Sequence, residues 1–254
     1  MHLTALHAAG DRHDVIPQKA KTLVQKTPAK TNGQAQVGLI RFGGLAIIIG
    51  LVIHVTLNSV LKEFPPEDLT PTELQVYLSN EASTWAIVHG FRYIAFACIV
   101  LFAAGLFART CCSRTPPTTG WGVVGLLGTA IFVTNGVITN GIEMLAFLNI
   151  DLLSQQQDLF WLLFRLTRVL FSAEIATWSI LILGFSIAGW RSTTIPKWLA
   201  VLGLLNVAAG LLTGGFIVSV VTDGWATIFA DVAALTGLAW FACVGVYMLI
   251  RGAS

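Results

Sequence analysis

Long apolar stretches alternate with short polar segments along the chain from residue 38 onwards. The hydrocarbon core of a bilayer is about 30 Å thick, and an α-helix needs roughly 20 apolar residues to cross it. Six stretches reach that length, so the pattern predicts an all-α polytopic membrane protein with six transmembrane helices in one bundle. The predicted spans are residues 38–60, 85–108, 121–149, 160–190, 196–221 and 225–250.

The composition agrees with a membrane protein. Hydrophobic residues make up 55% of the chain and charged residues 11%, whereas soluble domains carry about 25% charged residues. Residues 1–37 are polar and lack a helical apolar stripe, so we expect a disordered tail there. The four cysteines have no zinc-site spacing, and none lies in a predicted outside loop, so no disulfide framework is expected.

Loop charges predict the orientation of the spans. Basic residues occupy the N-terminal tail, the loop with Arg109 and Arg114, the loop with Arg191 and Lys197, and the C-terminal end, whereas acidic residues dominate the alternate loops. Positive charge stays on the cytoplasmic side. We therefore expect both termini in the cytoplasm and the protein in the plasma (inner) membrane. Tryptophans near predicted span ends, Trp85 among them, are typical of residues at the membrane interface.

The outside loop, residues 61–84, is the longest of the predicted loops. Thr70 followed by Pro71 and then by Glu73 is a helix-start signature. This pattern predicts a short surface helix over residues 71–79, lying across the outer mouth of the bundle.

Ionisable side chains inside the predicted spans gather in the outer half of the membrane. Such groups are costly in lipid, so they face the bundle interior and mark candidate sites. The candidate ligand-binding residues are His54, His89, Arg92, Glu143, Arg165, Arg168 and Asp231, with Asn58, Asn140 and Glu174 as secondary members. Because these residues come from all but one of the spans, we expect them to converge on a polar pocket open to the outside. The fourth span is polar on two faces, which predicts a central place for it.

Three interpretations of these charges remain open: salt bridges that fix the packing, a ligand pocket, and a proton or ion path. Haem ligation by His54 and His89 needs two histidines at similar depth, which they have. A metal site from His54, His89 and Asp231 has suitable ligand types but no supporting spacing. The sequence therefore leaves the cofactor unknown.

Two classes of function fit these observations. The favoured one is a non-enzymatic binding, sensing or accessory module; the alternative is a membrane enzyme or transporter that uses the charged cluster. No catalytic or nucleic-acid motif occurs in the sequence. The expected partners are membrane lipid, a small polar or anionic ligand, and a partner subunit or second copy of the chain.

The residues from Gly184 to Ser192, followed by Ile195-Pro196-Lys197-Trp198-Leu199 and Leu202-Gly203, resemble one stretch of a known family. It is the hairpin between the fourth and fifth spans of a large family of bacterial six-span membrane proteins catalogued as a domain of unknown function. The likeness covers mainly residues 184–212. Ala200 stands where that family usually has glycine. The resemblance implies a fold and a topology, and no catalytic residues.

The predicted orientation can be tested with reporter fusions. A reporter joined at Thr115 or Ser254 should lie in the cytoplasm, and one joined at Glu67 should lie outside, because the basic loops remain on the cytoplasmic side. A cytoplasmic signal from the fusion at Glu67 would contradict both the orientation and the depth assigned to the charged residues.

Overall fold

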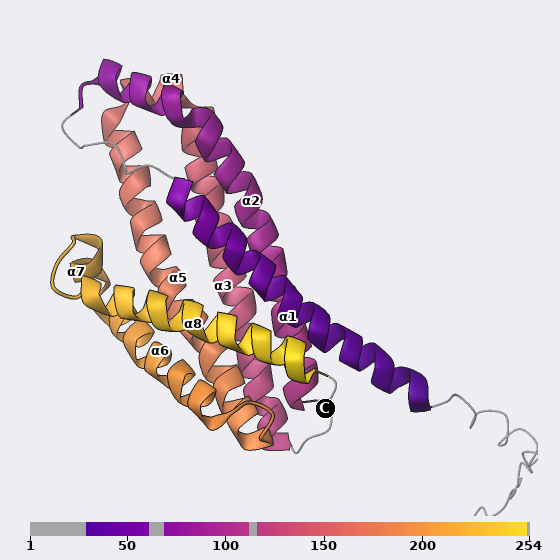
Figure 1. The fold of residues 1–254 in the computed structure, drawn as a ribbon. Helices are drawn as coiled ribbons and strands as arrows, with labels where there is room; N and C mark the ends of the chain where they lie inside the picture. The colour runs from indigo at the N-terminus through magenta and orange to yellow at the C-terminus, as the bar shows by residue number, and fades with distance from the viewer. Residues whose placement is uncertain (1–28, 61–68, 112–115, 253–254) are drawn as a thin grey trace, which may run out of the picture. The chain divides into compact units, whose positions relative to one another are not determined.

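The computed structural model describes residues 29–60, 69–111 and 116–252. Within these residues the chain forms helices and no strand. Six of the helices, α1, α2, α3, α5, α6 and α8, are long and apolar enough to cross a membrane. The predicted all-α fold with six candidate spans is therefore confirmed (Figure 1). The helices are α1 (Ala29–Val60), α2 (Pro71–Cys111), α3 (Pro116–Leu148), α4 (Ile150–Gln155), α5 (Gln157–Ser192), α6 (Lys197–Gly215), α7 (Ile217–Val221) and α8 (Thr227–Arg251).

The chain divides into two compact units, Met1–Ala35 and Gln36–Ser254. Of the first unit, the structure describes residues 29–35, which are helical and begin α1. The end of the predicted polar tail therefore belongs to a helix, while residues 1–28 of that tail lie outside the described residues. Every contact reported below lies within the second unit.

Helix α5 contacts α2, α3, α4, α6, α7 and α8, which confirms the central place predicted for the fourth span. Its closest neighbour is α3, and glycines allow the two backbones to touch. A methyl group at Gly128 would overlap the backbone nitrogen of Leu181, and one at Gly184 would overlap the backbone nitrogen of Gly125. Small residues permit such close approach between membrane helices.

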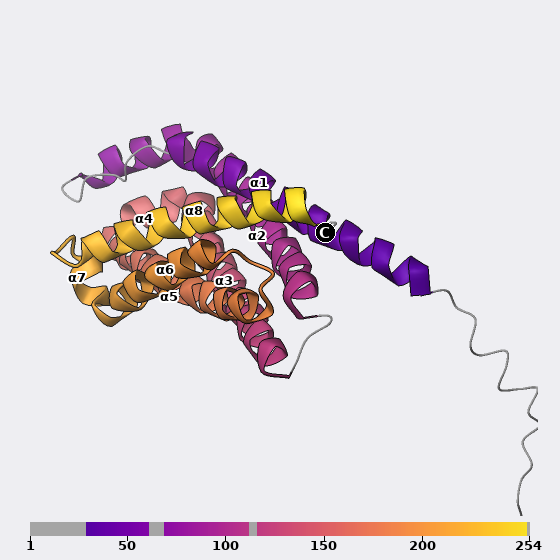
Figure 2. The ribbon, with the colours of Figure 1, turned by 60° about the horizontal axis from the view of Figure 1, so that its bottom comes forward.

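Helices α6 and α8 run alongside each other and pack on α5 (Figure 2). The buried Asn206 of α6 links the two helices, because its Nδ2 donates a 2.6 Å hydrogen bond to the carbonyl oxygen of Ala233. On the α5 side, Gly203 and Gly210 leave room for the hydroxyls of Ser186 and Ser179. Glycines thus permit close packing of α6 against α5 at these two positions.

The predicted helix start at Thr70 is present as a reciprocal capping box. The backbone nitrogen of Thr70 donates to Glu73 Oε2 at 2.8 Å, and the backbone nitrogen of Glu73 donates to Thr70 Oγ1 at 3.4 Å. However, no separate surface helix ends at residue 79. Helix α2 continues for 41 residues, because neither glycine nor proline interrupts residues 79–85.

The N-terminal part of α2 has a small hydrophobic core of its own. Leu74 and Leu78 pack with Leu153 of α4 and Phe160 of α5. Gln75 Nε2 also donates to Asp151 Oδ1 at 3.0 Å, which joins α2 to α4. The sequence interpretation assigned residues 150–159 to a loop, whereas the structure places α4 and the start of α5 there.

The predicted fifth span, residues 196–221, is divided in two in the structure. Helix α6 ends at Gly215, and α7 begins at Ile217 after Phe216 leaves the helical conformation with φ −110° and ψ 31°. Two consecutive glycines, Gly214 and Gly215, precede the break. Adjacent glycines weaken a helix because they lose the most backbone freedom on folding.

The α3–α5 contact predicts that one of two glycine substitutions on α3 lowers the stability of the protein and that the other does not. Gly128→Ala should lower the midpoint of thermal unfolding, followed by tryptophan fluorescence in detergent, because the new methyl group meets backbone atoms that cannot rotate away. Overpacking of this kind costs about 1–3 kcal/mol. Gly141→Ala is the matched control, since nothing lies within 4 Å of its added methyl group. Equal midpoints for the two variants would contradict the close approach of the helices.

Candidate functional site

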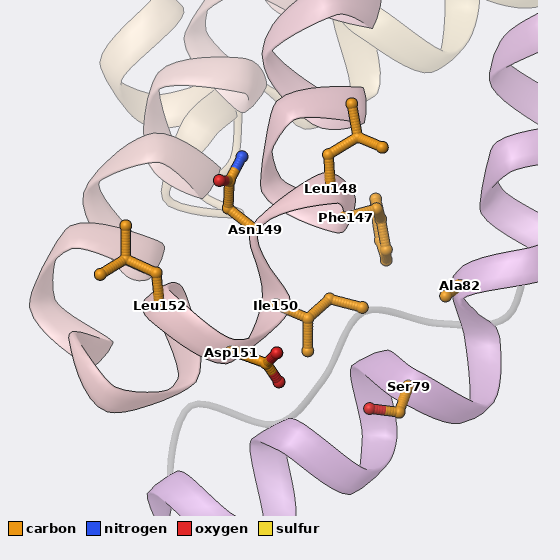
Figure 3. A pocket seen from close by; sticks show the side chains of 8 residues that line it. All are labelled: Ser79, Ala82, Phe147, Leu148, Asn149, Ile150, Asp151 and Leu152. Atoms are coloured by element: carbon orange, nitrogen blue, oxygen red, sulfur yellow. The ribbon is translucent and has the colours of Figure 1, made fainter.

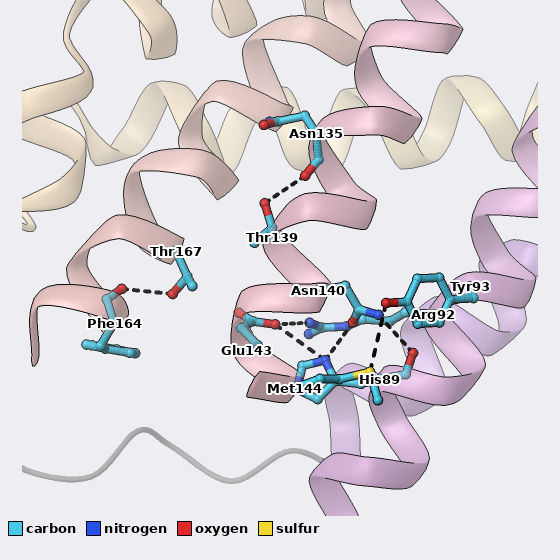
Figure 4. A network of polar contacts seen from close by, with 10 residues as sticks. All are labelled: His89, Arg92, Tyr93, Asn135, Thr139, Asn140, Glu143, Met144, Phe164 and Thr167. Carbon is cyan, nitrogen blue, oxygen red and sulfur yellow. Dashed lines mark hydrogen bonds and ion pairs between the residues drawn. The ribbon is translucent and has the colours of Figure 1, made fainter. Parts of the chain in front are cut away.

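The buried residues His89 on α2 and Asn140 on α3 are joined by two hydrogen bonds (Figure 4). Asn140 Nδ2 donates to the backbone oxygen of His89 at 3.0 Å, and Asn140 Oδ1 lies 2.6 Å from His89 Nδ1. The first bond fixes the amide so that its oxygen accepts from the ring. The neutral imidazole therefore carries its proton on Nδ1, and Nε2 keeps a lone pair. Among the described residues, the buried Nε2 has no hydrogen-bond partner.

One helical turn away, Arg92 and Glu143 form an ion pair between the same two helices. Arg92 Nη1 donates to Glu143 Oε2 at 2.7 Å, and His89 Nδ1 lies 3.5 Å from the same oxygen. His89 and Arg92 are three residues apart, as are Asn140 and Glu143, so each pair shares one face of its helix. Both contacts of Glu143 use Oε2, which leaves Oε1 available to a further donor.

Two further ionisable residues interact with this group. Arg92 interacts electrostatically with Glu174 of α5 and with His54 of α1. Glu174 faces α3, because a methyl group at Gly136 would lie 3.1 Å from Glu174 Oε1. His54 Nε2 lies 3.0 Å from Asn58 Nδ2 on its own helix. Arg92 thus forms an ion pair with Glu143 of α3 and interacts electrostatically with Glu174 of α5.

The remaining predicted site residues lie elsewhere. Arg168 pairs with Asp223 at 2.6 Å, and their side chains are 36% and 71% exposed. Arg165 on α5 and Asp231 on α8 are exposed. The structure therefore brings together four predicted residues, His89, Arg92, Asn140 and Glu143, with Glu174 and His54 nearby. It does not bring all seven primary candidates into one cavity.

Two cavities lie near this group. The larger, of about 510 Å³, is an open hollow between α2 and the junction of α3 with α4 (Figure 3). Its walls include the highly exposed Leu148 and the exposed Leu152, and the carboxylate of Asp151 already accepts from Gln75. None of the predicted site residues lines it.

The smaller cavity, of about 30 Å³, lies between α2, α3 and α5. It is lined by Tyr77, Leu78, Trp85, Ile142, Glu143, Ala146, Phe147, Phe160, Leu163, Phe164 and Thr167. Of these side chains, Glu143 is the acidic one. Five are aromatic, and two pairs are stacked: Trp85 with Phe147 at a centroid distance of 4.6 Å, and Phe160 with Phe164 at 6.4 Å. The hydroxyl of Thr167 donates to the carbonyl oxygen of Phe164 at 2.8 Å.

Further polar contacts join the helices around this region. Asn135 Nδ2 of α3 donates to the carbonyl oxygen of Leu170 on α5 at 2.9 Å, and Tyr93 on α2 contacts the sulfur of Met144 at 3.9 Å. Among the residues that the structure describes, no group of three or more His, Cys, Asp or Glu side chains is arranged to hold a metal ion.

The aromatic lining of the cavity was missed by the sequence interpretation. Trp85 was assigned to the membrane interface, and Phe160 and Phe164 of the fourth span received no role. A signal was present, because Phe160, Phe164 and Thr167 recur at i, i+4 and i+7 and so share one helical face. Comparison of the chain with protein-family models, with curated proteins and with solved structures finds no significant match. Function must therefore be inferred from the chain's own residues.

The two ion pairs predict different stabilities for two arginine variants. Arg92→Met should lower the thermal midpoint strongly, because it leaves the carboxylate of Glu143 without its ion-pair partner; breaking a buried pair costs about 3–5 kcal/mol in soluble proteins. Arg168→Met, the matched control, removes an exposed pair, and such pairs contribute about 0–1 kcal/mol. A larger loss of thermal stability for Arg168→Met than for Arg92→Met would contradict this assignment.

Proposed function

We propose that the chain is a non-enzymatic membrane protein that binds a small molecule in the cavity between α2, α3 and α5, as a sensor or accessory module. The observation that carries this proposal is the position of Glu143. Glu143 is part of the cavity wall, while its Oε2 is held by Arg92 and lies beside His89. A molecule that enters the cavity therefore meets a polar group whose orientation is already fixed.

The lining supports binding as the role of this cavity. Ligand sites are mostly apolar and aromatic, with a few placed polar groups that fix orientation. Here five aromatic and several aliphatic side chains form an almost wholly apolar lining, with Glu143 and Thr167 among the residues of the wall. Packing alone does not require a carboxylate to border an open space. The polar group also joins α2 to α3, so an occupant of the cavity acts directly on the contact between two spans.

The proposal includes a location and an orientation. Both termini lie in the cytoplasm of a cell whose plasma membrane holds the protein, which the alternation of basic and acidic loops supports. In that orientation the cavity opens towards the outer side. The likeness of residues 184–212 to a family of bacterial six-span membrane proteins agrees with this topology.

The accessibility of the cavity can be measured with an introduced cysteine. In a chain whose native cysteines are replaced by alanine, Ala146→Cys should react with methyl methanethiosulfonate, a small neutral reagent, because Ala146 lines the cavity. Intact-protein mass spectrometry reports the added thiomethyl group.

Two matched positions calibrate this reaction. Ser83→Cys on α2 is exposed and should react fully, whereas Thr139→Cys on α3 is buried and should react only after unfolding. If Ala146→Cys behaves like Thr139→Cys, the cavity does not admit small molecules and the proposed function is wrong.

A further inference from the structure

We infer that one end of the bundle is a docking surface for a basic amphipathic helix of another protein. This end, called the α4 end here, consists of residues 69–84, which include the start of α2, and residues 145–159, which include α4. Its centre is the open hollow of about 510 Å³ between α2 and the junction of α3 with α4 (Figure 3). The inference goes beyond the small-molecule cavity and does not depend on it.

The lengths of the helices place the α4 end beyond the lipid. Helix α6 has 19 residues and is therefore about 28 Å long, close to the thickness of the hydrocarbon core. Helices α2 and α5 have 41 and 36 residues, which correspond to about 61 and 54 Å. Both continue past α7 to the end of the bundle where α4 lies (Figure 1). Side chains exposed at that end therefore face water or a partner protein.

Large apolar side chains are exposed around the hollow. Leu148, the last residue of α3, is 76% exposed, and Leu152 of α4 is 51% exposed. Both belong to the wall of the hollow, and Ser79 and Ala82 of α2 belong to it as well. Apolar side chains that are exposed together outside lipid mark interaction sites. An amphipathic helix binds at such a place by laying its apolar face into the groove.

The charge of the α4 end favours a basic partner over a second copy of this chain. Residues 69–84 and 145–159, all of which the structure describes, contain no Lys, Arg or His. Their charged residues are Glu73, Glu81, Asp151 and Asp158. A second copy docked through the same surface would bring like charges together, which is costly across an interface. Lys and Arg side chains on a partner helix would instead complement these acids.

The hollow itself offers acceptors for a Lys or Arg side chain. Helix α3 ends there at Leu148, and the last carbonyl groups of a helix carry a partial negative charge that cations stabilise. The last turn of α3 contains no basic residue. Asp151 Oδ1 accepts from Gln75, and among the described residues Oδ2 has no donor, which leaves it available to a cation.

Photo-cross-linking in the host cell tests this docking surface. The full chain, with p-benzoylphenylalanine in place of Leu148, would be irradiated in its own membrane, and mass spectrometry would identify the cross-linked segment. We expect a segment of another protein with Lys or Arg and with apolar residues at helical spacing. Val218 of α7 is the matched control position, because it is 75% exposed and does not line the hollow. The yield of protein cross-links should be at least tenfold lower there.

The other outcomes of this experiment would overturn the inference. A cross-link to a second copy of this chain would make the surface an interface between copies. A cross-link to lipid alone would place the α4 end within the bilayer. An acidic cross-linked segment, or equal yields of protein cross-links at positions 148 and 218, would also contradict the proposal.

Two variants, each carrying the photo-reactive residue at position 148, assign the binding to the hollow. Leu152→Asp should lower the cross-linking yield at least tenfold, because it places a charge on the apolar part of the surface. Asp151→Asn should lower it about threefold, since exposed ion pairs contribute little. Asp231→Asn, which removes an exposed carboxylate of α8, is the control and should leave the yield unchanged. An unchanged yield in Leu152→Asp would overturn the location, and one in Asp151→Asn would overturn the preference for a basic partner.

Discussion

The ion pair between Arg92 and Glu143, with the His89–Asn140 hydrogen bonds one turn away, is the contact on which the packing of α2 against α3 depends. A charged side chain at the centre of a membrane helix costs about 2.5–3.5 kcal/mol on insertion scales. Two helices that carry such residues must pack so that these side chains meet. This requirement fixes both the shift of one helix along the other and its rotation about its own axis. The 2.7 Å contact between Arg92 and Glu143 therefore fixes how α2 lies against α3.

The opposite end of α2 is held by another arginine. Arg109 Nη1 donates to the carbonyl oxygen of Arg251 at 2.8 Å, Arg109 Nε donates to that of Thr194 at 3.3 Å, and its guanidinium lies over the ring of Tyr247. This arginine ties α2 to the end of α8 and to the α5–α6 connection. Between the two ends, α3 and α5 touch through glycines, which places Glu174 of α5 opposite Gly136 of α3. The cavity thus lies between three helices. The Arg92–Glu143 ion pair sets the position of α2 against α3, and glycines set the position of α3 against α5.

Much of this arrangement is readable from the sequence, because its physical causes are local. The spacings of His89 with Arg92 and of Asn140 with Glu143 place each pair on one helical face, and the common depth of both pairs predicts that the faces meet. The capping box at Thr70 is equally local. The depth of a residue alone does not reveal its direction around the helix axis, so Arg165 and Asp231 were placed in the pocket although both are exposed.

Other features depend on tertiary geometry that the pattern does not contain. Arg168 forms an ion pair with Asp223. Asp223 lies in the connection between α7 and α8, and its backbone has a left-handed φ of 53°. Neither the break after Gly215 nor that backbone conformation follows from apolar periodicity. Helix α4 has 6 residues, too few for a periodic signal to be distinguished from a loop. The aromatic rings that line the cavity come from three helices, α2, α3 and α5. They can be recognised as one lining only when the packing of these helices is known.

A double-mutant cycle on Arg92 and Glu143 tests the central claim most directly. The free energies of unfolding of Arg92→Met, Glu143→Leu and the double variant would be measured by reversible detergent denaturation. The account predicts that the double variant is more stable than the sum of the single effects allows, with a coupling of about 1–3 kcal/mol, as contacting charged residues give. Additive effects, with a coupling near zero, would mean that the two side chains do not hold α2 to α3, and would contradict the account.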